Sequence, residues 1–209
     1  MSDLAPAPPP GEPAPLAVVR DERLQIMEAM AEVMAELGFA ATTVDDVVER
    51  AGVDREAFDR HFPTKLACFL AAFDEASEQL FVPIAARVTV ATDAVAPLGP
   101  AERLEEFDEL FGAYLEGIAA RPHLARVFLI EVYAAGPEAM ERRTRLQAII
   151  TDATAALLGA SNDRGRFACQ ALVAAIGALV TSLLAADDLT GIRQLREPIV
   201  DLAARSLLA

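Results

Sequence analysis

Residues 37–65 are the part of this sequence whose residue types and spacing suggest chemistry. Two short amphipathic helical patterns flank a turn of small residues, Ala51-Gly52-Val53, and follow a longer amphipathic pattern. In a helix-turn-helix, a supporting helix and a turn present the second helix to the major groove of DNA. The pattern therefore predicts sequence-specific binding of double-stranded DNA.

The charge of this segment conflicts with that prediction. Asp54, Glu56 and Asp59 lie on the second short helix, and residues 20–65 hold six basic and eleven acidic residues. Because affinity grows with the number of phosphates neutralised, we expect weak, salt-sensitive binding, although carboxylates can accept from cytosine amino groups. A second hypothesis therefore stays open: a dimeric ligand-sensing or protein-partner module that keeps the helix-turn-helix and has lost DNA binding.

Catalytic and metal-binding patterns are missing from the sequence. His61 and His123 are its two histidines, and neither stands at triad or metal-ligand spacing from Cys, Asp or Glu. Cys68 and Cys169 fall inside helical patterns, as buried thiols of an intracellular protein do. We predict neither an enzyme nor a dependence on a metal or cofactor.

The elements that must position these residues are helical. Of the 209 residues 54% are apolar, Ala, Leu, Glu and Arg dominate, and alternating strand patterns are missing, so the fold class is all-α with about nine helices. A Pro/Ala-rich leader, residues 1–15, is expected to be disordered. Residues 16–65 then form the three-helix DNA-binding domain and residues 66–209 a helical body. The net charge of −14 argues against non-specific coating of DNA.

One segment is long enough to cross a bilayer. Residues 167–186 hold no charged side chain over 20 positions. The segment is rich in alanine, contains Gln170, and ends at Asp187 and Asp188, so its hydrophobicity is weak. We predict a helix buried all round in a bundle or dimer core. With no secretory signal pattern at the N-terminus, a cytoplasmic protein without membrane contact is expected.

Residues 20–70 resemble the TetR family of bacterial transcriptional regulators. The resemblance rests on Ile26, Ala29, Val33, Met34, Gly38-Phe39, Thr42-Thr43-Val44, Glu49-Arg50-Ala51-Gly52-Val53, Phe58 and His61-Phe62-Pro63-Thr64-Lys65. It implies a homodimer whose two helix-turn-helix units enter successive major grooves of a near-palindromic operator. It also implies a small-molecule effector that binds in the body, changes the separation of these units and relieves repression.

The resemblance also implies which residues contact DNA. Thr43 and Lys65, at helix starts, would contact phosphates, and Arg55 would read base edges. Ala57 would touch a thymine methyl group, and Asp59 stands where the family usually has a phosphate-contacting tyrosine. The full set is Thr43, Arg55, Glu56, Ala57, Asp59, Arg60, His61 and Lys65.

A ligand pocket and a dimer interface follow from the same resemblance. An apolar or aromatic effector would lie among Phe73, Arg103, Phe107, Phe111, Tyr114, Phe128, Glu131 and Tyr133, with Arg103 or Glu131 as polar anchors. The last two helices, near residues 164–186 and 192–208, would pair with their copies in a four-helix bundle. Its contacts would be Ala168, Ala171, Leu172, Ala175, Gly177, Ala178, Leu179 and Leu183, for which plain internal core is the alternative.

Overall fold

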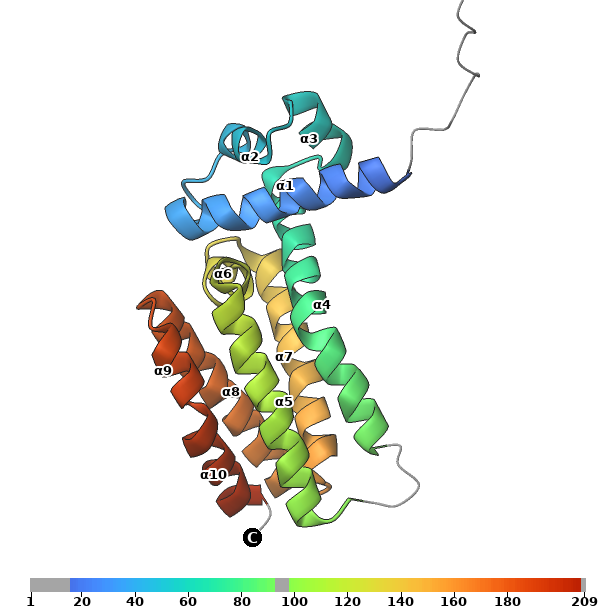
Figure 1. The fold of residues 1–209 in the computed structure, drawn as a ribbon, viewed down its shortest axis with the longest axis vertical. Helices are drawn as coiled ribbons and strands as arrows, with labels where there is room; N and C mark the ends of the chain where they lie inside the picture. The colour runs from blue at the N-terminus through green and yellow to red at the C-terminus, as the bar shows by residue number, and fades with distance from the viewer. Residues whose placement is uncertain (1–15, 93–97, 208–209) are drawn as a thin grey trace, which may run out of the picture.

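The computed structural model describes residues 16–92 and 98–207, and this part of the chain is entirely helical (Figure 1). The predicted all-α fold is confirmed, while the leader at residues 1–15 lies outside the described residues. The helices are α1 (Leu16–Leu37), α2 (Val44–Ala51), α3 (Arg55–His61), α4 (Lys65–Thr92), α5 (Pro100–Ala120), α6 (Pro122–Leu129), the 3-10 helix η1 (Glu131–Tyr133), α7 (Pro137–Leu158), α8 (Asp163–Ala185), α9 (Leu189–Gln194) and α10 (Arg196–Leu207). The final helix expected from the sequence is therefore two helices that meet at Leu195.

Local capping sets the ends of the first three helices, which we call the N-terminal unit (α1–α3). Gly38 and Gly52 take left-handed φ values of 78° and 68° after α1 and α2, where a side chain would be strained. Thr43 caps the start of α2, and Asp54 caps α3 by accepting from the Ala57 amide at 2.7 Å. The turn between α2 and α3 is thus fixed by residues within it.

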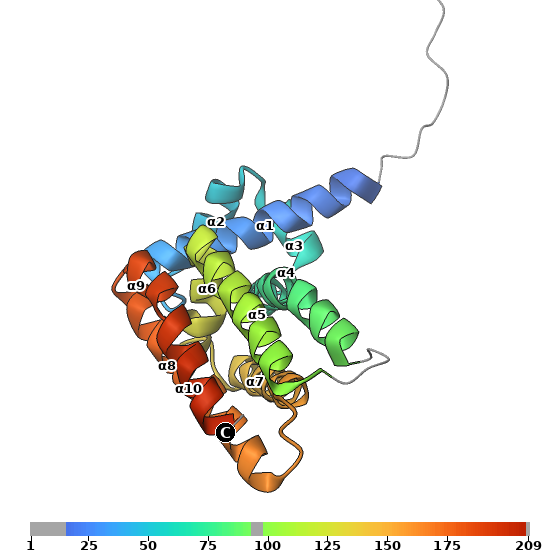
Figure 2. The same cartoon turned by 60° about the horizontal axis from the view of Figure 1, so that its bottom comes forward.

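The remaining helices form the body (α4–α10), and the N-terminal unit lies across one end of it (Figure 1). In Figures 1 and 2, α8 and α10 lie side by side along one edge of the body, and α4 lies at the opposite edge. One hydrophobic core runs through both parts, from Ile26 and Met30 in α1 to Phe69 in α4 and Val127 in α6. The packing of α1 on α4 and α6 joins the N-terminal unit directly to the body.

Burial of α8 is one-sided. Cys169, Leu172, Ile176, Val180 and Leu184 recur every three or four residues and are buried in the body. By length and composition α8 alone among the described helices could cross a membrane, which is weak support for a span. Its opposite face is exposed in the single chain, so the all-round burial predicted from the sequence would require a partner on that face.

Candidate DNA-binding surface and ligand cavity

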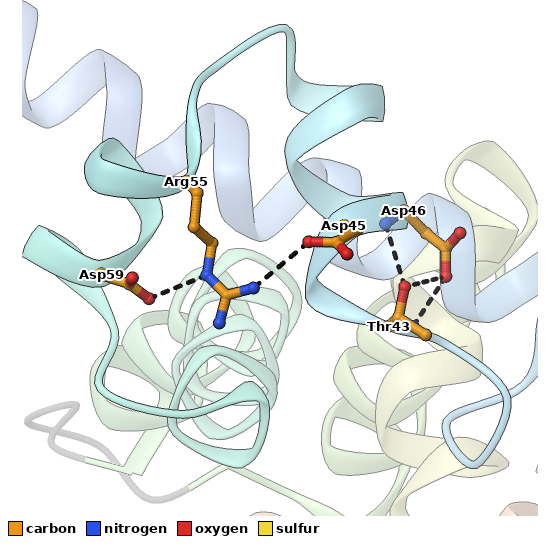
Figure 3. Close-up of polar contacts among 5 residues, drawn as sticks. All are labelled: Thr43, Asp45, Asp46, Arg55 and Asp59. Carbon is orange, nitrogen blue, oxygen red and sulfur yellow. Dashed lines mark hydrogen bonds and ion pairs between the residues drawn. The ribbon is translucent and has the colours of Figure 1, made fainter.

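Thr43 forms a capping box with Asp46 at the start of α2 (Figure 3). The Thr43 hydroxyl accepts from the Asp46 amide at 3.2 Å and donates to the Asp46 carboxylate at 2.6 Å, and the Thr43 amide donates to the same carboxylate at 2.8 Å. These hydrogen bonds to the ionised form, the one from the hydroxyl first, lower the pKa of Asp46 below its usual range. Thr43 remains exposed at a helix N-terminus, the position that a phosphate contact requires.

Arg55 is held by two carboxylates in the free protein (Figure 3). Its Nε donates to Asp59 one turn later at 3.2 Å, and its Nη1 donates to Asp45 in the first turn of α2 at 3.2 Å. The hydrogen bond that Arg55 donates to Asp59, more than the charge of Asp45, raises the pKa of Arg55. All three side chains are exposed, so DNA can displace these pairs at small cost.

Arg60 and His61 share one acceptor, Glu22 in α1. Arg60 Nη2 lies 3.1 Å and His61 Nε2 lies 2.9 Å from Glu22 Oε2. The hydrogen bond from His61, followed by that from Arg60, lowers the pKa of the Glu22 carboxyl. Both predicted DNA-contacting residues therefore fasten α3 to α1, and His61 is largely buried while Arg60 keeps an exposed side chain.

Lys65 and Ala57 face the protein rather than solvent. Lys65 Nζ donates to the carbonyls of Phe39 and Thr42, each at 2.8 Å, and lies 4.4 Å from the centre of the Phe39 ring. It thus ties the turn between α1 and α2 to the start of α4. Ala57 is 3% exposed, so its methyl group packs in the core and is not presented to a thymine.

The exposed members of the predicted DNA-contacting set are Thr43, Arg55, Glu56, Asp59 and Arg60. The four of them on α3 carry two positive and two negative charges. Sequence reasoning missed Asp45 and Glu22 as partners of this surface. The spacing of Arg55 and Asp59, four residues apart, is one at which ion pairs form within a helix, but pairs that join separate helices have no such pattern.

A cavity of about 190 Å³ lies inside the body between α4, α5, α6, α7 and α8. Phe107, Phe111, Tyr114 and Phe128 from the predicted pocket line it, together with Phe81. Their rings form a continuous series, with centroids 5.8 Å apart for Phe107–Phe111, 6.2 Å for Phe111–Tyr114, 5.8 Å for Phe81–Tyr114 and 5.9 Å for Phe81–Phe128. The lining is almost wholly apolar, as in sites for small organic ligands.

The other predicted pocket residues lie elsewhere. Phe73 is buried in the core. Arg103 donates to the carbonyls of Ala156 and Leu157 at the end of α7. Tyr133 is 55% exposed in η1. None of these three side chains lines the described cavity.

Glu131, proposed as a polar anchor, instead joins the body to the N-terminal unit. Its carboxylate accepts from the backbone amide of Phe39 at 2.7 Å, and the residue is 9% exposed. The bond connects η1 to the turn that precedes Thr43. A buried carboxylate needs a hydrogen-bond donor, and the Phe39 amide supplies one to Glu131.

The cavity residues that sequence reasoning missed lie mostly on α7. They follow one face of that helix at spacings of three and four: Arg143, Leu146, Gln147, Ile150, Ala153, Thr154 and Leu157. This periodicity is visible in the sequence, but it does not distinguish a cavity face from a packed face. The polar side chains among them are Arg143, Gln147 and Thr154.

The predicted interface residues of α8 divide between its two faces. Ala171, Ala178 and Leu179 are exposed, and Leu179 is 43% exposed. Leu172 packs in the body core and Gly177 lines the cavity, which fits the alternative of internal contacts for these two. Ala168, Ala175 and Leu183 are partly buried.

A three-helix unit with a capped helix-turn-helix, packed on a helical body with an apolar cavity, defines a class of bacterial transcriptional regulators. Residues 26–72 match the family model described as bacterial regulatory proteins, tetR family. The match covers the helix-turn-helix, so this part of the chain is that of a tetR-family regulator, and the chain as a whole is similar to a known transcriptional regulator.

Three known proteins illustrate the likeness. The transcriptional activator FasR of Mycolicibacterium smegmatis is 28% identical over 165 residues, 78% of this chain and 70% of FasR. The fatty acid degradation regulator FadR of Bacillus halodurans has a TM-score of 0.72 at 20% identity, covering 87% of this chain and 93% of that one. FadR of Bacillus subtilis, in complex with stearoyl-CoA, has a TM-score of 0.68 at 19% identity, covering 86% and 96%. The two structural likenesses establish the fold.

Proposed function

We propose that this protein is a homodimer that binds a near-palindromic operator and leaves it when a small apolar effector fills the body cavity. The observation that carries the proposal is the pairing, in one chain, of a capped helix-turn-helix with an aromatic-lined cavity over a shared core. A ligand moves such an equilibrium only if it binds one form better than the other. An occupied cavity meets that condition if filling it shifts the surrounding helices.

The exposed face of α8 supports the dimer. Phe167 is 70% exposed on α8 and Leu202 is 41% exposed on α10, and these two helices run along the same edge of the body (Figure 2). Two copies that bury this face would form a four-helix interface and place their α3 helices at a fixed separation. Half-sites lie about 34 Å apart on B-DNA, so a modest change in that separation weakens both contacts together.

Glu131 supports the coupling between the cavity and DNA. It lies in η1 between α6 and α7, both of which contribute to the cavity lining, and it holds the Phe39 amide at 2.7 Å. Lys65 holds the Phe39 carbonyl from the other side. A ligand that displaces α6 or α7 would therefore shift the turn that sets the position of Thr43 and α2.

Repression is the proposed output, because a dimer bound over a promoter excludes polymerase and its release restores access. The FasR relative is by its name an activator, so the position of the operator decides the sign. The complex of B. subtilis FadR with stearoyl-CoA supports an effector with an apolar chain. The expected location is the cytoplasm, where the operator is.

Selection from random duplex DNA at about 50 mM and about 150 mM salt tests the proposal against the partner-module alternative. Light scattering on the same preparation reports the mass. A dimer that enriches a palindrome, and loses it on Arg55→Ala but not on Arg87→Ala in α4, supports the regulator. A monomer, or no enrichment even at low salt, would reject it in favour of the module whose acidic α3 no longer binds DNA.

A further inference from the structure

Arg143 brings a positive charge to the wall of the apolar cavity without a carboxylate partner among the described residues. Its Nη1 donates to the Gln147 side-chain oxygen at 3.2 Å, and its guanidinium lies 4.9 Å from the centre of the Tyr133 ring. Its Nε is buried and has no hydrogen-bond partner. The adjacent Arg142, by contrast, is paired with Asp74.

An unpaired guanidinium in this position carries a cost. Arginine stays protonated in proteins, so it cannot relieve the loss of hydration by losing its proton. One neutral amide and one aromatic ring replace only part of the hydration that the guanidinium has in water. An anion that enters the cavity would supply the missing acceptor.

Two neutral groups near Arg143 can share such an anion. Tyr114 lines the cavity, and among the described residues its hydroxyl has no hydrogen-bond partner. Burial raises the pKa of Tyr114, opposed in part by the charge of Arg143, so the phenol stays protonated and can donate. The Gln147 amide nitrogen is a further donor, because Arg143 occupies only the oxygen.

We propose that the effector is an amphiphilic monocarboxylate, with its carboxylate on Arg143 and its apolar part among the aromatic side chains of the cavity. This inference rests on the proposed function, because it names the ligand class of the same cavity. One guanidinium with neutral neighbours suits a single negative charge, and a planar carboxylate can take two of its N–H groups. The cavity of about 190 Å³ exceeds the roughly 150 Å³ that holds a benzene ring in an engineered protein, so an aromatic or short aliphatic body fits.

The test compares acids with their neutral esters on the full chain. 4-Phenylbutyrate and dodecanoate, and the methyl ester of each, displace the neutral fluorophore N-phenyl-1-naphthylamine from the cavity. The acids are expected to bind the wild type about tenfold or more tightly than the esters, the scale of one charge-assisted contact. Arg143→Met should abolish this preference, and Arg143→Lys should keep part of it.

Arg145→Met is the matched control, because it removes the same charge from the exposed side of α7. It should keep the full preference for acids. Binding of the fluorophore itself shows that each variant retains a folded cavity. Stearoyl-CoA serves as a thioester probe, whose acyl group lacks a free carboxylate.

Three outcomes would overturn the inference. Esters or stearoyl-CoA that bind and release operator as well as the acids would sink it and leave the proposed function standing. If Arg143→Met still binds acids more tightly than esters, the carboxylate binds at a site other than Arg143. A wild type that binds neither acid, ester nor fluorophore would end both the inference and the proposed effector site.

Discussion

Arginines on the DNA-facing surface and the arginine in the cavity differ in their partners. Arg50, Arg55 and Arg60 in the N-terminal unit each pair with carboxylates, Arg50 with both Glu32 and Glu36. Arg143 in the body pairs with none of the described carboxylates. These three arginines of the N-terminal unit are neutralised in the absence of ligand, whereas Arg143 is available to an anion.

The difference separates two ways of binding an anion. On the exposed α3 surface, DNA would have to take Arg55 from Asp45 and Asp59, so each contact formed would be offset by one lost. Binding there depends on the balance of weak exposed pairs and is screened by salt. At the cavity wall none of the described carboxylates competes for Arg143, whose Nε is buried. If α3 contacts DNA, its acidic residues would lower the affinity and still leave Arg55 available to read a base.

Removing Arg55 has the largest expected effect. If Arg55 reads a guanine, Arg55→Ala should weaken binding to the selected operator by roughly ten- to a hundredfold, the range of one bidentate base contact. Fluorescence anisotropy with labelled duplex measures it. Arg87→Ala, which removes an exposed, carboxylate-paired arginine of α4 at the edge opposite α8, should leave affinity unchanged.

Loss of affinity on Arg55→Ala must also be specific. Binding to random duplex should fall much less than binding to the operator, because only the base contact is sequence-dependent. An equal fall in affinity for both duplexes would show that Arg55 contacts phosphate. Arg55 and Arg143 would then differ only in how their charges are paired.

Freeing Arg55 should strengthen binding. The double variant Asp45→Asn with Asp59→Asn removes both carboxylates that hold the guanidinium. Affinity for operator and random duplex should both rise, by about tenfold at 50 mM salt, because two charges facing phosphates disappear. Unchanged affinity would mean that the α3 surface does not approach the backbone. Asp152→Asn, which neutralises an exposed acid of α7, is the control.

Removing the hydrogen bond between Glu131 and Phe39 should leave the cavity and the DNA-binding surface intact and weaken the coupling between them. Glu131→Ala removes the acceptor of the Phe39 amide. Operator affinity and ligand affinity should change little, while the ratio of operator affinities with and without ligand shrinks by about two- to thirtyfold. Glu138→Ala, an exposed acid in the first turn of α7, should leave the ratio as it is. If Glu131→Ala leaves the ratio of operator affinities with and without ligand unchanged, the coupling would instead run through the packing of α1 on α4 and α6.

Local rules explain what the sequence predicted well. The caps at Gly38, Thr43, Gly52 and Asp54 depend on residues within a few positions, so the limits of α2 and α3 followed from the pattern. Arg143 and Glu131 depend on neighbours brought together by tertiary packing. Periodicity alone identified neither the partner of Glu131 nor the lack of one at Arg143. The fold was therefore predictable, and the cavity's polar chemistry was not.

Thr43→Ala has the smallest expected effect and tests whether the exposed polar groups of the N-terminal unit serve stability as well as DNA. Loss of this N-cap should lower the free energy of unfolding by about 1 kcal/mol, or about 2–4 °C in Tm for a chain of this size. The capping partner Asp46 has a lowered pKa in the folded protein, so its contribution is present above its usual value of 3.8 and is lost as the pH falls through the lower folded value. The Tm difference between wild type and variant should therefore narrow on acidification from pH 7 to about pH 3.

Thr64→Ala is the matched control, because Thr64 caps α4 by accepting from the Ala67 amide at 3.0 Å and no carboxylate takes part in that cap. Its Tm difference should stay constant over the same range, and a parallel narrowing in both variants would remove Asp46 as the cause.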